Sequence, residues 1–309
     1  MKMLAPWQKS MMQMQRATII AEVGCNHRGC FDTAKEMIVI AKMFCQVDVV
    51  KFQKRSPREL LNSWEYNSPH PEPYHSYGHT YGEHRENLEF TIDQHRELKQ
   101  MCEHIGIGYS SSVWDMTSAR EIASLQPSMI KVPSACNQRF DIMSLLADEF
   151  AGEIHVSLGM THRDEEEEIV HFLGNKRRLS SVVLYACTSG YPVDFDDVAL
   201  LEVTRLRDAY GQMVKNIGFS GHHLGIAIDS VAYSLGANYL ERHFTLDRTW
   251  KGTDHAASLE PDGLRRIVRD TDAVRRAYQY KHKDILDIEE RQRSKLKRVE
   301  SAVAATGKA

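Results

Sequence analysis

The hydrophobic pattern alternates along the chain between short β-branched runs, typical of buried parallel strands, and amphipathic stretches, typical of helices. Eight apolar runs carry the strand pattern, at residues 18–23, 47–53, 106–111, 129–132, 153–157, 181–186, 216–220 and 238–242. Helices are predicted after these runs at about residues 32–45, 91–104, 115–125, 140–150, from 164 onward, 196–210, 226–235 and 261–278. Asp115 is placed to cap the helix that follows the third run.

Eight strand–helix units predict a parallel sheet, and a closed TIM (β/α)8 barrel is favoured over an open doubly wound sheet. An open sheet usually has a glycine-rich phosphate loop after its first strand, and Gly24-Cys-Asn-His-Arg-Gly29 matches no such fingerprint. We therefore expect an N-terminal extension over residues 1–16 and a single-domain barrel over residues 17–278, with a long segment after its second strand. A charged helical tail is expected over residues 279–309.

Composition and charge exclude several classes of partner. Hydrophobic residues make up 42% of the chain, charged residues 26%, and the net charge is −3, so there is no general attraction to nucleic acid or to a membrane surface. No apolar run approaches the roughly 20 residues of a membrane span, and no signal peptide is recognised. The six cysteines contain no C-x-x-C pair and are expected to be reduced thiols of a cytoplasmic protein rather than disulfides or zinc ligands.

Polar side chains gather at the carboxyl ends of the predicted strands, where a barrel of this kind builds its active site. They are Glu22 and Asn26, Lys51 and Gln53, Ser111 and Ser112, Lys131 and Ser134, Ser157, Thr188, Ser189 and Tyr191, Ser220 and His222, and His243 with Asp254 beyond it. Lys51 and Lys131 stand inside apolar strands, where a lysine is costly to bury without a counter-charge. Each is either half of an ion pair, a lysine that reaches solvent, or part of a pocket for a compact anion. Two such lysines beside hydroxyl groups favour the anion pocket.

His222 and His243 end two adjacent strands, which brings their imidazoles close together. Most histidines at strand ends are simply hydrogen-bonded polar residues. Two adjacent imidazoles with open positions also suit a divalent transition ion such as manganese, with water or substrate as further ligands.

Six segments at these strand ends, with one more in the loop after the last strand, resemble the sialic acid synthase (N-acetylneuraminate synthase) family. They are Ala21-Glu-Val-Gly-Cys-Asn-His27, Val50-Lys-Phe-Gln53, Lys131-Val-Pro-Ser134, Cys187-Thr-Ser-Gly-Tyr-Pro192, Ile217-Gly-Phe-Ser-Gly-His222, Arg242-His-Phe-Thr-Leu-Asp247 and Gly252-Thr-Asp-His-Ala-Ala-Ser-Leu-Glu-Pro261. The resemblance runs in order over about residues 17–275.

The resemblance implies a TIM-barrel enzyme, usually a homodimer or other homo-oligomer, that condenses phosphoenolpyruvate with an open-chain aldose such as N-acetylmannosamine. The product would be a nine-carbon 2-keto-3-deoxy acid. The residues that it assigns to phosphoenolpyruvate are Lys51, Ser112, Lys131, Ser134, Ser157, Ser189 and Ser220. It assigns a divalent metal, Mn²⁺ or Mg²⁺, to His222 and His243. It places Glu22, Gln53, Tyr191 and Asp254 at the acceptor sugar, and either Glu22 or Asp254 would manage the protons.

Two departures from the family pattern and one long segment concern the acceptor. The family usually continues into an antifreeze-like domain that reaches the partner's site, and this chain is expected to lack one. His223 stands where many members have threonine, and either adds a metal ligand or covers the site. Residues 54–90 form a long, irregular segment rich in aromatic and histidine residues. We expect this segment to be a lid in which Tyr81 or Arg85 contacts the acceptor; the alternatives are a packed surface loop or a subunit contact.

Other functions and acceptors remain open at this point. A metal-dependent hydrolase also places histidines at barrel strand ends, although it normally has more histidine and carboxylate ligands. A non-catalytic relative that binds a sugar acid is a third reading. The acceptor alternatives are mannose, a di-acetamido hexose or a shorter phosphorylated sugar. No arginine cluster for a second phosphate is evident, which favours an unphosphorylated acceptor.

Overall fold

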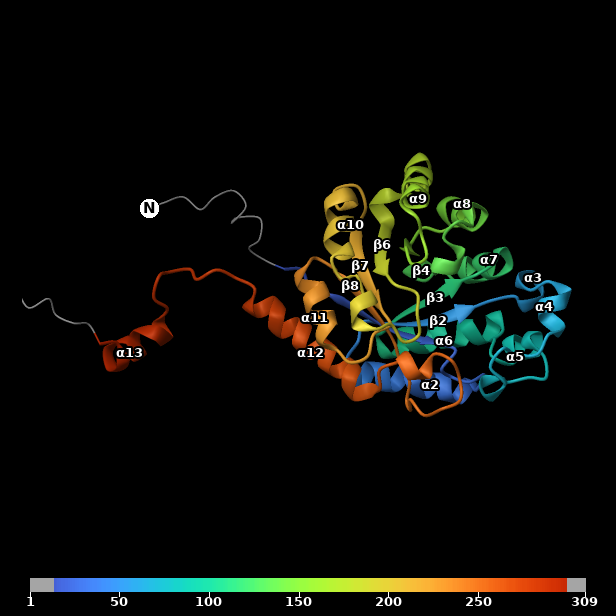
Figure 1. Cartoon of the computed structure of the whole chain (residues 1–309), viewed down its shortest axis with the longest axis horizontal. Helices are drawn as coiled ribbons and strands as arrows, with labels where there is room; N and C mark the ends of the chain where they lie inside the picture. The colour runs from blue at the N-terminus through green and yellow to red at the C-terminus, as the bar shows by residue number, and fades with distance from the viewer. Residues whose placement is uncertain (1–13, 299–309) are drawn as a thin grey trace, which may run out of the picture. The chain divides into compact units, whose positions relative to one another are not determined.

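Eight parallel strands close into a barrel in which each strand pairs with its neighbours in the sequence and β8 pairs with β1. This arrangement is seen in a computed structural model that describes residues 14–298 (Figure 1). The strands are β1 (Thr18–Gly24), β2 (Val49–Lys54), β3 (Gly108–Val113), β4 (Met129–Val132), β5 (Glu153–Ser157), β6 (Val182–Cys187), β7 (Asn216–Gly221) and β8 (Tyr239–His243). The predicted TIM barrel is confirmed.

The strand ends agree with the sequence prediction to within a residue or two, and the differences have local causes. β3 begins at Gly108 and not at residue 106, because Gly106 takes a left-handed conformation (φ 73°) that ends the preceding helix. Ile107 N then donates to Cys102 O at 2.9 Å, a helix-ending bond that keeps residues 106 and 107 out of the strand.

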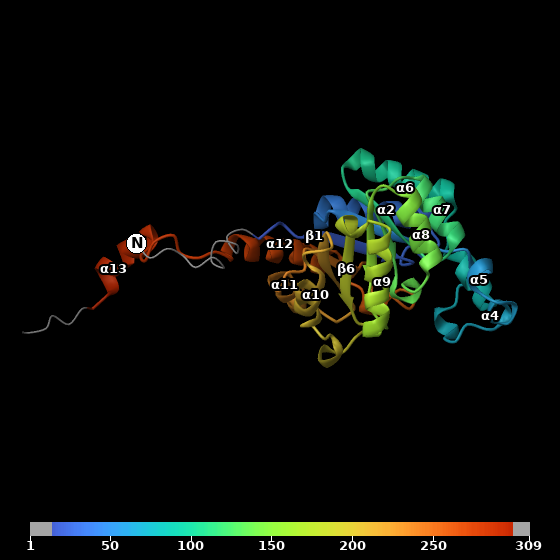
Figure 2. The ribbon, with the colours of Figure 1, turned by 90° about the horizontal axis from the view of Figure 1, so that it is seen from above.

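Helices surround the strands, as Figures 1 and 2 show. The helices that follow the strands are α2 (Phe31–Ile40) with a π-helical turn η1 (Ala41–Cys45), α6 (Ile92–Ile105), α7 (Met116–Ser124), α8 (Phe140–Glu149), α9 (Arg163–Asn175), α10 (Glu202–Tyr210), α11 (Ala227–Ser234) and α12 (Pro261–Ala277). Short 3₁₀ turns are η3 (Ser134–Cys136), η4 (Leu179–Ser181), η5 (Phe195–Asp197) and η6 (His255–Ala257). The predicted cap of α7 is confirmed, because the Asp115 side chain accepts from Ser118 N at 2.7 Å.

Inward-facing side chains fill the barrel in layers, because every second residue of a strand points to the same face. The apolar layer consists of Ile20, Val49, Met129, Val183, Tyr185 and Tyr239. Two residues further along β1, β2, β4 and β8 the inward positions are Glu22, Lys51, Lys131 and Glu241, all of them buried. The interior therefore changes from apolar to charged as the strands approach their carboxyl ends.

The sequence predicted an irregular segment between β2 and α6. The structure instead shows four short helices there. They are α3 (Pro57–Leu60), α4 (Ser63–Asn67), η2 (Pro73–His75) and α5 (Tyr81–Asn87). Local caps account for two of them: Asn62 and Glu65 form a capping box at α4, and the Thr80 side chain accepts from Glu83 N at α5. Both views show α4 and α5 grouped together at one end of the barrel unit (Figures 1 and 2).

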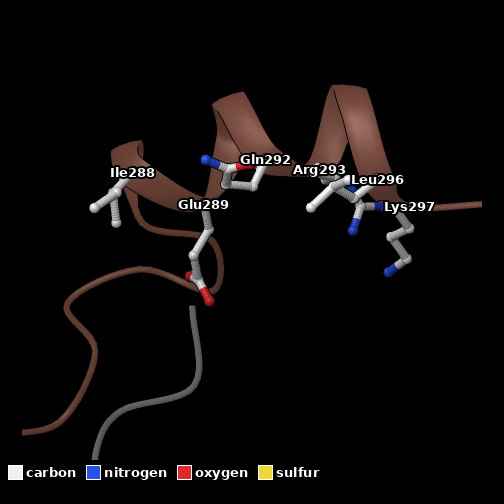
Figure 3. A pocket seen from close by; sticks show the side chains of 6 residues that line it. All are labelled: Ile288, Glu289, Gln292, Arg293, Leu296 and Lys297. Atoms are coloured by element: carbon white, nitrogen blue, oxygen red, sulfur yellow. The ribbon is translucent and has the colours of Figure 1, made fainter.

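The described residues form two compact units, one from Gln15 to Val274 and another that includes the chain from Arg275 onward. The second unit contains α13 (Asp287–Leu296), which lies within the predicted charged helical tail. One side of α13 presents the exposed Ile288 and Leu296, and Figure 3 shows them together with Gln292 between charged neighbours. Residues 1–13 and 299–309, which hold most of the expected N-terminal extension and the end of the tail, lie outside the described residues. No helix within residues 14–298 is long and apolar enough to cross a membrane.

Candidate active site

Lys51 and Lys131 point into the barrel, and each meets a buried carboxylate. Lys51 Nζ lies 2.5 Å from Glu22 Oε2 and donates to Ser112 Oγ at 2.7 Å. Lys131 Nζ lies 2.8 Å from Glu241 Oε1, which is also 3.6 Å from Lys51 Nζ. Both lysines therefore form ion pairs, which was one of the three alternatives, and both pairs lie inside the barrel. Two cations and two anions form one connected network.

Glu241 is the residue of this candidate site that the sequence reasoning missed. It stands in the middle of β8 and is 5% exposed. Its Oε1 accepts from Ser220 Oγ at 3.2 Å as well as from Lys131. A signal was present, since the rule that a buried lysine needs a counter-charge directs the search to acids inside the other strands.

The surroundings of the two carboxylates move their pKa values in opposite directions. Burial raises the pKa of Glu22 above its usual range, more than the neighbouring Lys51 lowers it. Burial also acts on Glu241, but Lys131 and Lys51 outweigh it and lower the pKa of that carboxyl to about 2. Glu241 therefore keeps its charge, whereas Glu22 is the carboxylate that takes up a proton more readily.

The predicted serines divide into two groups around this network. Ser112 and Ser220 contact it directly, through Lys51 and Glu241. Ser134 and Ser189 meet at Gly159, where an added Cβ would lie 2.7 Å from Ser134 Oγ and 2.4 Å from Ser189 Oγ. A side chain at position 159 would therefore displace both hydroxyls, and Gly159 N donates to Ser134 Oγ at 3.1 Å.

Ser157 is the remaining predicted serine. It is 3% exposed and ends β5, the strand next to the one that carries Lys131. The structure thus distributes the five predicted hydroxyls over β3, β5, β7 and the turns after β4 and β6.

His222 and His243 come together as predicted, with ring centroids 5.4 Å apart. His222 Nδ1 lies 2.9 Å from the carbonyl oxygen of Thr188, so Nδ1 carries the proton and Nε2 keeps its lone pair. Burial lowers the pKa of His222 to about 3, which keeps the ring neutral. Tyr191, 51% exposed, places its ring 4.4 Å from His222 and 5.8 Å from His243.

These two imidazoles fit a metal as a pair of ligands. A neutral ring whose Nδ1 is bound to a carbonyl is the usual form of a metal-ligating histidine. In addition, His243 Nδ1 is buried without a hydrogen-bond partner among the described residues. No group of three or more His, Cys, Asp or Glu side chains within residues 14–298 is arranged to hold an ion. Water or substrate would therefore complete the coordination.

Gln53 and Asp254 lie beside Glu22 at the turn after β1. Gln53 Nε2 donates to Glu22 Oε1 at 3.1 Å. An added Cβ at Gly24, which has φ 53°, would lie 3.1 Å from Gln53 Nε2 and 3.7 Å from Asp254 Oδ2. Burial alone would raise the pKa of Asp254, but His243 and the Thr253 hydroxyl outweigh it and lower that pKa. Asp254 is therefore ionised at neutral pH.

The segment after β2 meets the loop after β8. Tyr77 Oη donates to the carbonyl oxygen of Lys251, and Gly252 N donates to His75 Nδ1 at 3.1 Å. On the same segment Arg85 Nε donates to Tyr81 Oη at 3.0 Å, so the two predicted acceptor contacts are bonded to each other. No contact of Tyr81 or Arg85 with the lysines or the histidine pair is observed in the described part of the chain. Their roles stay predictions.

Comparison with known proteins shows the family to which this barrel belongs. A model described as the NeuB family matches residues 37–283. The chain is 38% identical over 271 residues to N-acetylneuraminate-9-phosphate synthase of Homo sapiens, covering 88% of this chain and 74% of that protein. It is 30% identical over 265 residues to N,N'-diacetyllegionaminic acid synthase of Campylobacter jejuni, covering 85% and 78%.

The chain belongs to the NeuB family. The family predicted from the sequence is confirmed, and with it the prediction that the protein is an enzyme, a synthase of the sialic acid and related sugar-acid group. A crystal structure of N-acetylneuraminic acid synthetase from Leptospira borgpetersenii in complex with citrate is similar to it. That likeness has a TM-score of 0.76 and 25% identity, and it covers 91% of this chain and 93% of the other.

His223 does not join the histidine pair of this NeuB-family barrel. It is fully buried, and its Nε2 contacts Arg242 Nη1 at 3.0 Å, whereas His222 contacts the Thr188 carbonyl. Of the two alternatives raised for His223, a metal ligand or a cover over the site, the first does not agree with this geometry.

Proposed function

We propose that this protein condenses phosphoenolpyruvate with an open-chain aldose to give a 2-keto-3-deoxy sugar acid of nine carbons and phosphate. The observation that carries the proposal is the Lys51–Glu22 and Lys131–Glu241 network inside the barrel. It stands at the strand ends that also bring together His222 and His243.

Phosphoenolpyruvate would be held by Lys51 and Lys131 together with the surrounding hydroxyls. Its phosphate and carboxylate oxygens accept hydrogen bonds from ammonium and hydroxyl groups. The hydroxyl donors are Ser112, Ser134, Ser157, Ser189 and Ser220. Glu22 and Glu241 balance the lysines before the anion arrives, which explains how two lysines are tolerated in a buried layer.

His222 and His243 would hold a divalent cation, Mn²⁺ or Mg²⁺. When bound, such an ion polarises the aldehyde of the acceptor. The neutral ring of His222 and its free Nε2 support this role. Tyr191 packs against both rings and would hold the acceptor next to them.

The reaction forms a bond between carbon 3 of phosphoenolpyruvate and the aldehyde carbon, whose oxygen takes up a proton. Water adds at carbon 2 and loses a proton, and phosphate leaves with cleavage of its carbon–oxygen bond. Of the two acids considered for these transfers, the raised pKa of Glu22 and the lowered pKa of Asp254 favour Glu22. Asp254 and Gln53 would then position the acceptor hydroxyls.

The acceptor is an N-acetylmannosamine-like aldose, and its phosphorylated form is the second candidate. The relatives are named for products of both kinds, a 9-phosphate and an unphosphorylated acid. Arg85 pairs with no carboxylate in the described part of the chain and bonds only to Tyr81. Arg28, after β1, lies 3.7 Å from the ring centroid of Trp250 in the loop after β8. These cations favour a test of phosphorylated sugars beside neutral ones.

A panel of aldoses incubated with phosphoenolpyruvate and Mn²⁺ tests the proposal, with the product identified by mass spectrometry. We expect one aldose class to give a product heavier by the three carbons of pyruvate, with stoichiometric phosphate release. Lys51→Met should abolish it. Lys54→Met is the matched control, because Lys54 is a buried lysine of the same strand that pairs with Glu121 at 3.1 Å. Phosphate release without an aldose, or no product from any aldose, contradicts the proposal.

A further inference from the structure

Three buried polar side chains near the histidine pair have no part in the proposed chemistry. Arg242 is 1% exposed, and His223 and Asp229 are fully buried. Arg242 belongs to β8, His223 follows β7, and Asp229 lies in the first turn of α11. A buried guanidinium is costly unless its hydrogen bonds are satisfied, so this cluster is a built feature of the barrel wall.

Arg242 connects three chain segments through one guanidinium. Its Nη1 donates to Asp229 Oδ2 at 2.6 Å and to the carbonyl oxygen of Gly225 at 3.0 Å. The same Nη1 lies 3.0 Å from His223 Nε2, and Nη2 donates to the carbonyl oxygen of His223 at 2.5 Å. The strand β8 is thereby tied to the residues after β7 and to α11.

His223 Nε2 meets two members of the cluster at once, with Arg242 Nη1 at 3.0 Å and Asp229 Oδ2 at 3.4 Å. A guanidinium only donates hydrogen bonds, so a bond between Arg242 and the side chain at position 223 needs an acceptor there. A side chain that offers an acceptor at the same place, such as glutamine, can keep this bond. A leucine of similar size cannot.

The outer cluster and the inner histidine pair come from the same two chain segments. Arg242 and His243 are consecutive residues of β8 and so point to opposite faces, and beyond the end of β7 His222 contacts the Thr188 carbonyl whereas His223 contacts Arg242. Arg242 precedes His243 and His223 follows His222, so the outer contact and the inner pair join the same two strand ends. The backbone pairing of β7 with β8 ends at Gly221 and Arg242. Beyond that pair, the side chains of the outer cluster hold the two ends together.

We infer that His223, Asp229 and Arg242 are positioning residues that fix the spacing of His222 and His243, and through it the affinity of the pair for a divalent cation. The inference rests on the proposed function, because it requires that the two histidines bind a metal. It concerns the cluster on the outer face, which touches neither substrate nor metal.

The test compares His223→Leu with His223→Gln, using free Mn²⁺ measured by electron paramagnetic resonance and no substrate. Groups that hydrogen-bond a metal-ligating histidine typically contribute about 10–100-fold in metal affinity, and His223 acts one step further out, through the strand ends. We therefore expect His223→Leu to weaken Mn²⁺ binding by about tenfold, the lower end of that range, and His223→Gln to bind within about twofold of the wild type. Arg242→Lys keeps the positive charge but loses the planar guanidinium with its several fixed donors, so it should also weaken Mn²⁺ binding. Thermal melts of the metal-free variants show whether each is folded.

The outcomes separate this inference from the proposed function. If the wild type binds Mn²⁺ and folded His223→Leu binds it equally well, the cluster is only structural and the inference is wrong. If His223→Gln loses affinity as much as His223→Leu, the bond to Arg242 is not the cause, and the inference is also wrong. A wild type that binds no Mn²⁺ overturns the metal site itself, and the inference with it.

Discussion

Lys131 and Glu241 meet across the barrel, with Nζ and Oε1 2.8 Å apart, although their strands β4 and β8 are four positions apart in an eight-stranded ring. The pair therefore spans the interior, and Lys131 also lies 4.0 Å from the ring centroid of Tyr185. A charged pair in this position links opposite walls of the barrel and lies directly on top of its apolar layer.

Removing one partner of this pair should destabilise the protein more than removing both. Lys131→Met leaves the Glu241 carboxylate buried with only Lys51 nearby, and we expect a loss of about 3 kcal/mol in the free energy of unfolding. Adding Glu241→Gln to that variant should recover most of the loss without recovering activity. Urea unfolding and phosphate release measure the two effects. Equal stability of the single and the double variant would show that the pair is not coupled.

Removal of the metal should abolish the reaction. Chelation with EDTA is expected to stop phosphate release, and Mn²⁺ should restore it. His222→Ala and His243→Ala should each weaken Mn²⁺ binding by more than the roughly 10–100-fold typical of an outer partner, because each removes a ligand. His171→Ala, in an exposed position of α9, is the control. Full turnover of the EDTA-treated protein contradicts the metal role.

Arg85 should act on the acceptor and not on phosphoenolpyruvate. Loss of a charge-assisted hydrogen bond costs about 1.5–3 kcal/mol, so Arg85→Ala should raise the Michaelis constant of the acceptor by roughly tenfold or more. The constant for phosphoenolpyruvate should not change. Arg58→Ala is the matched control, since Arg58 belongs to the same segment, is exposed and pairs with Glu86. An unchanged acceptor constant and turnover in Arg85→Ala would rule out this role.

The lowered pKa of Glu153, at the start of β5, leads to a prediction of how the free energy of unfolding depends on pH. Burial alone would raise the pKa of Glu153, but hydrogen bonds from His155, Lys215 and Tyr239 outweigh it and lower that pKa to about 2 from 4.5. The folded state thus favours the carboxylate. Its contribution is complete above about pH 4.5 and is lost as the pH falls toward about 2.

Glu153→Gln should therefore lower the free energy of unfolding at neutral pH, by roughly 2 kcal/mol. The difference from the wild type should shrink between about pH 4.5 and about pH 3. Urea unfolding at several pH values measures it, with Glu168→Gln on an exposed position of α9 as the control. A difference that stays constant with pH would show that the carboxylate charge is not responsible.

The barrel was predictable from the sequence because its signals are local. Short β-branched runs and amphipathic stretches alternate eight times. Within each strand, every second side chain points into the barrel and the others point outward. The buried lysines Lys51 and Lys131 were visible for the same reason, as charges inside apolar runs.

What the sequence did not reveal depends on contacts between distant segments. Glu241 was overlooked because Lys131, the residue with which it pairs, is 110 residues away in the sequence. Nothing in the residues next to Glu241 indicates that pairing. The direction of the His223 ring likewise depends on Arg242 in another strand. The helices between β2 and α6 are a different case, because the capping box of Asn62 and Glu65 is a local signal that was not used.

The most direct measurement of the central claim is a crystal structure of the protein with phosphoenolpyruvate and Mn²⁺. The account predicts phosphate or carboxylate oxygens within hydrogen-bonding distance of Lys51 Nζ and Lys131 Nζ, with the ion bound to His222 and His243 beside them. Phosphoenolpyruvate bound outside the barrel interior, or an ion held by other residues, would contradict it.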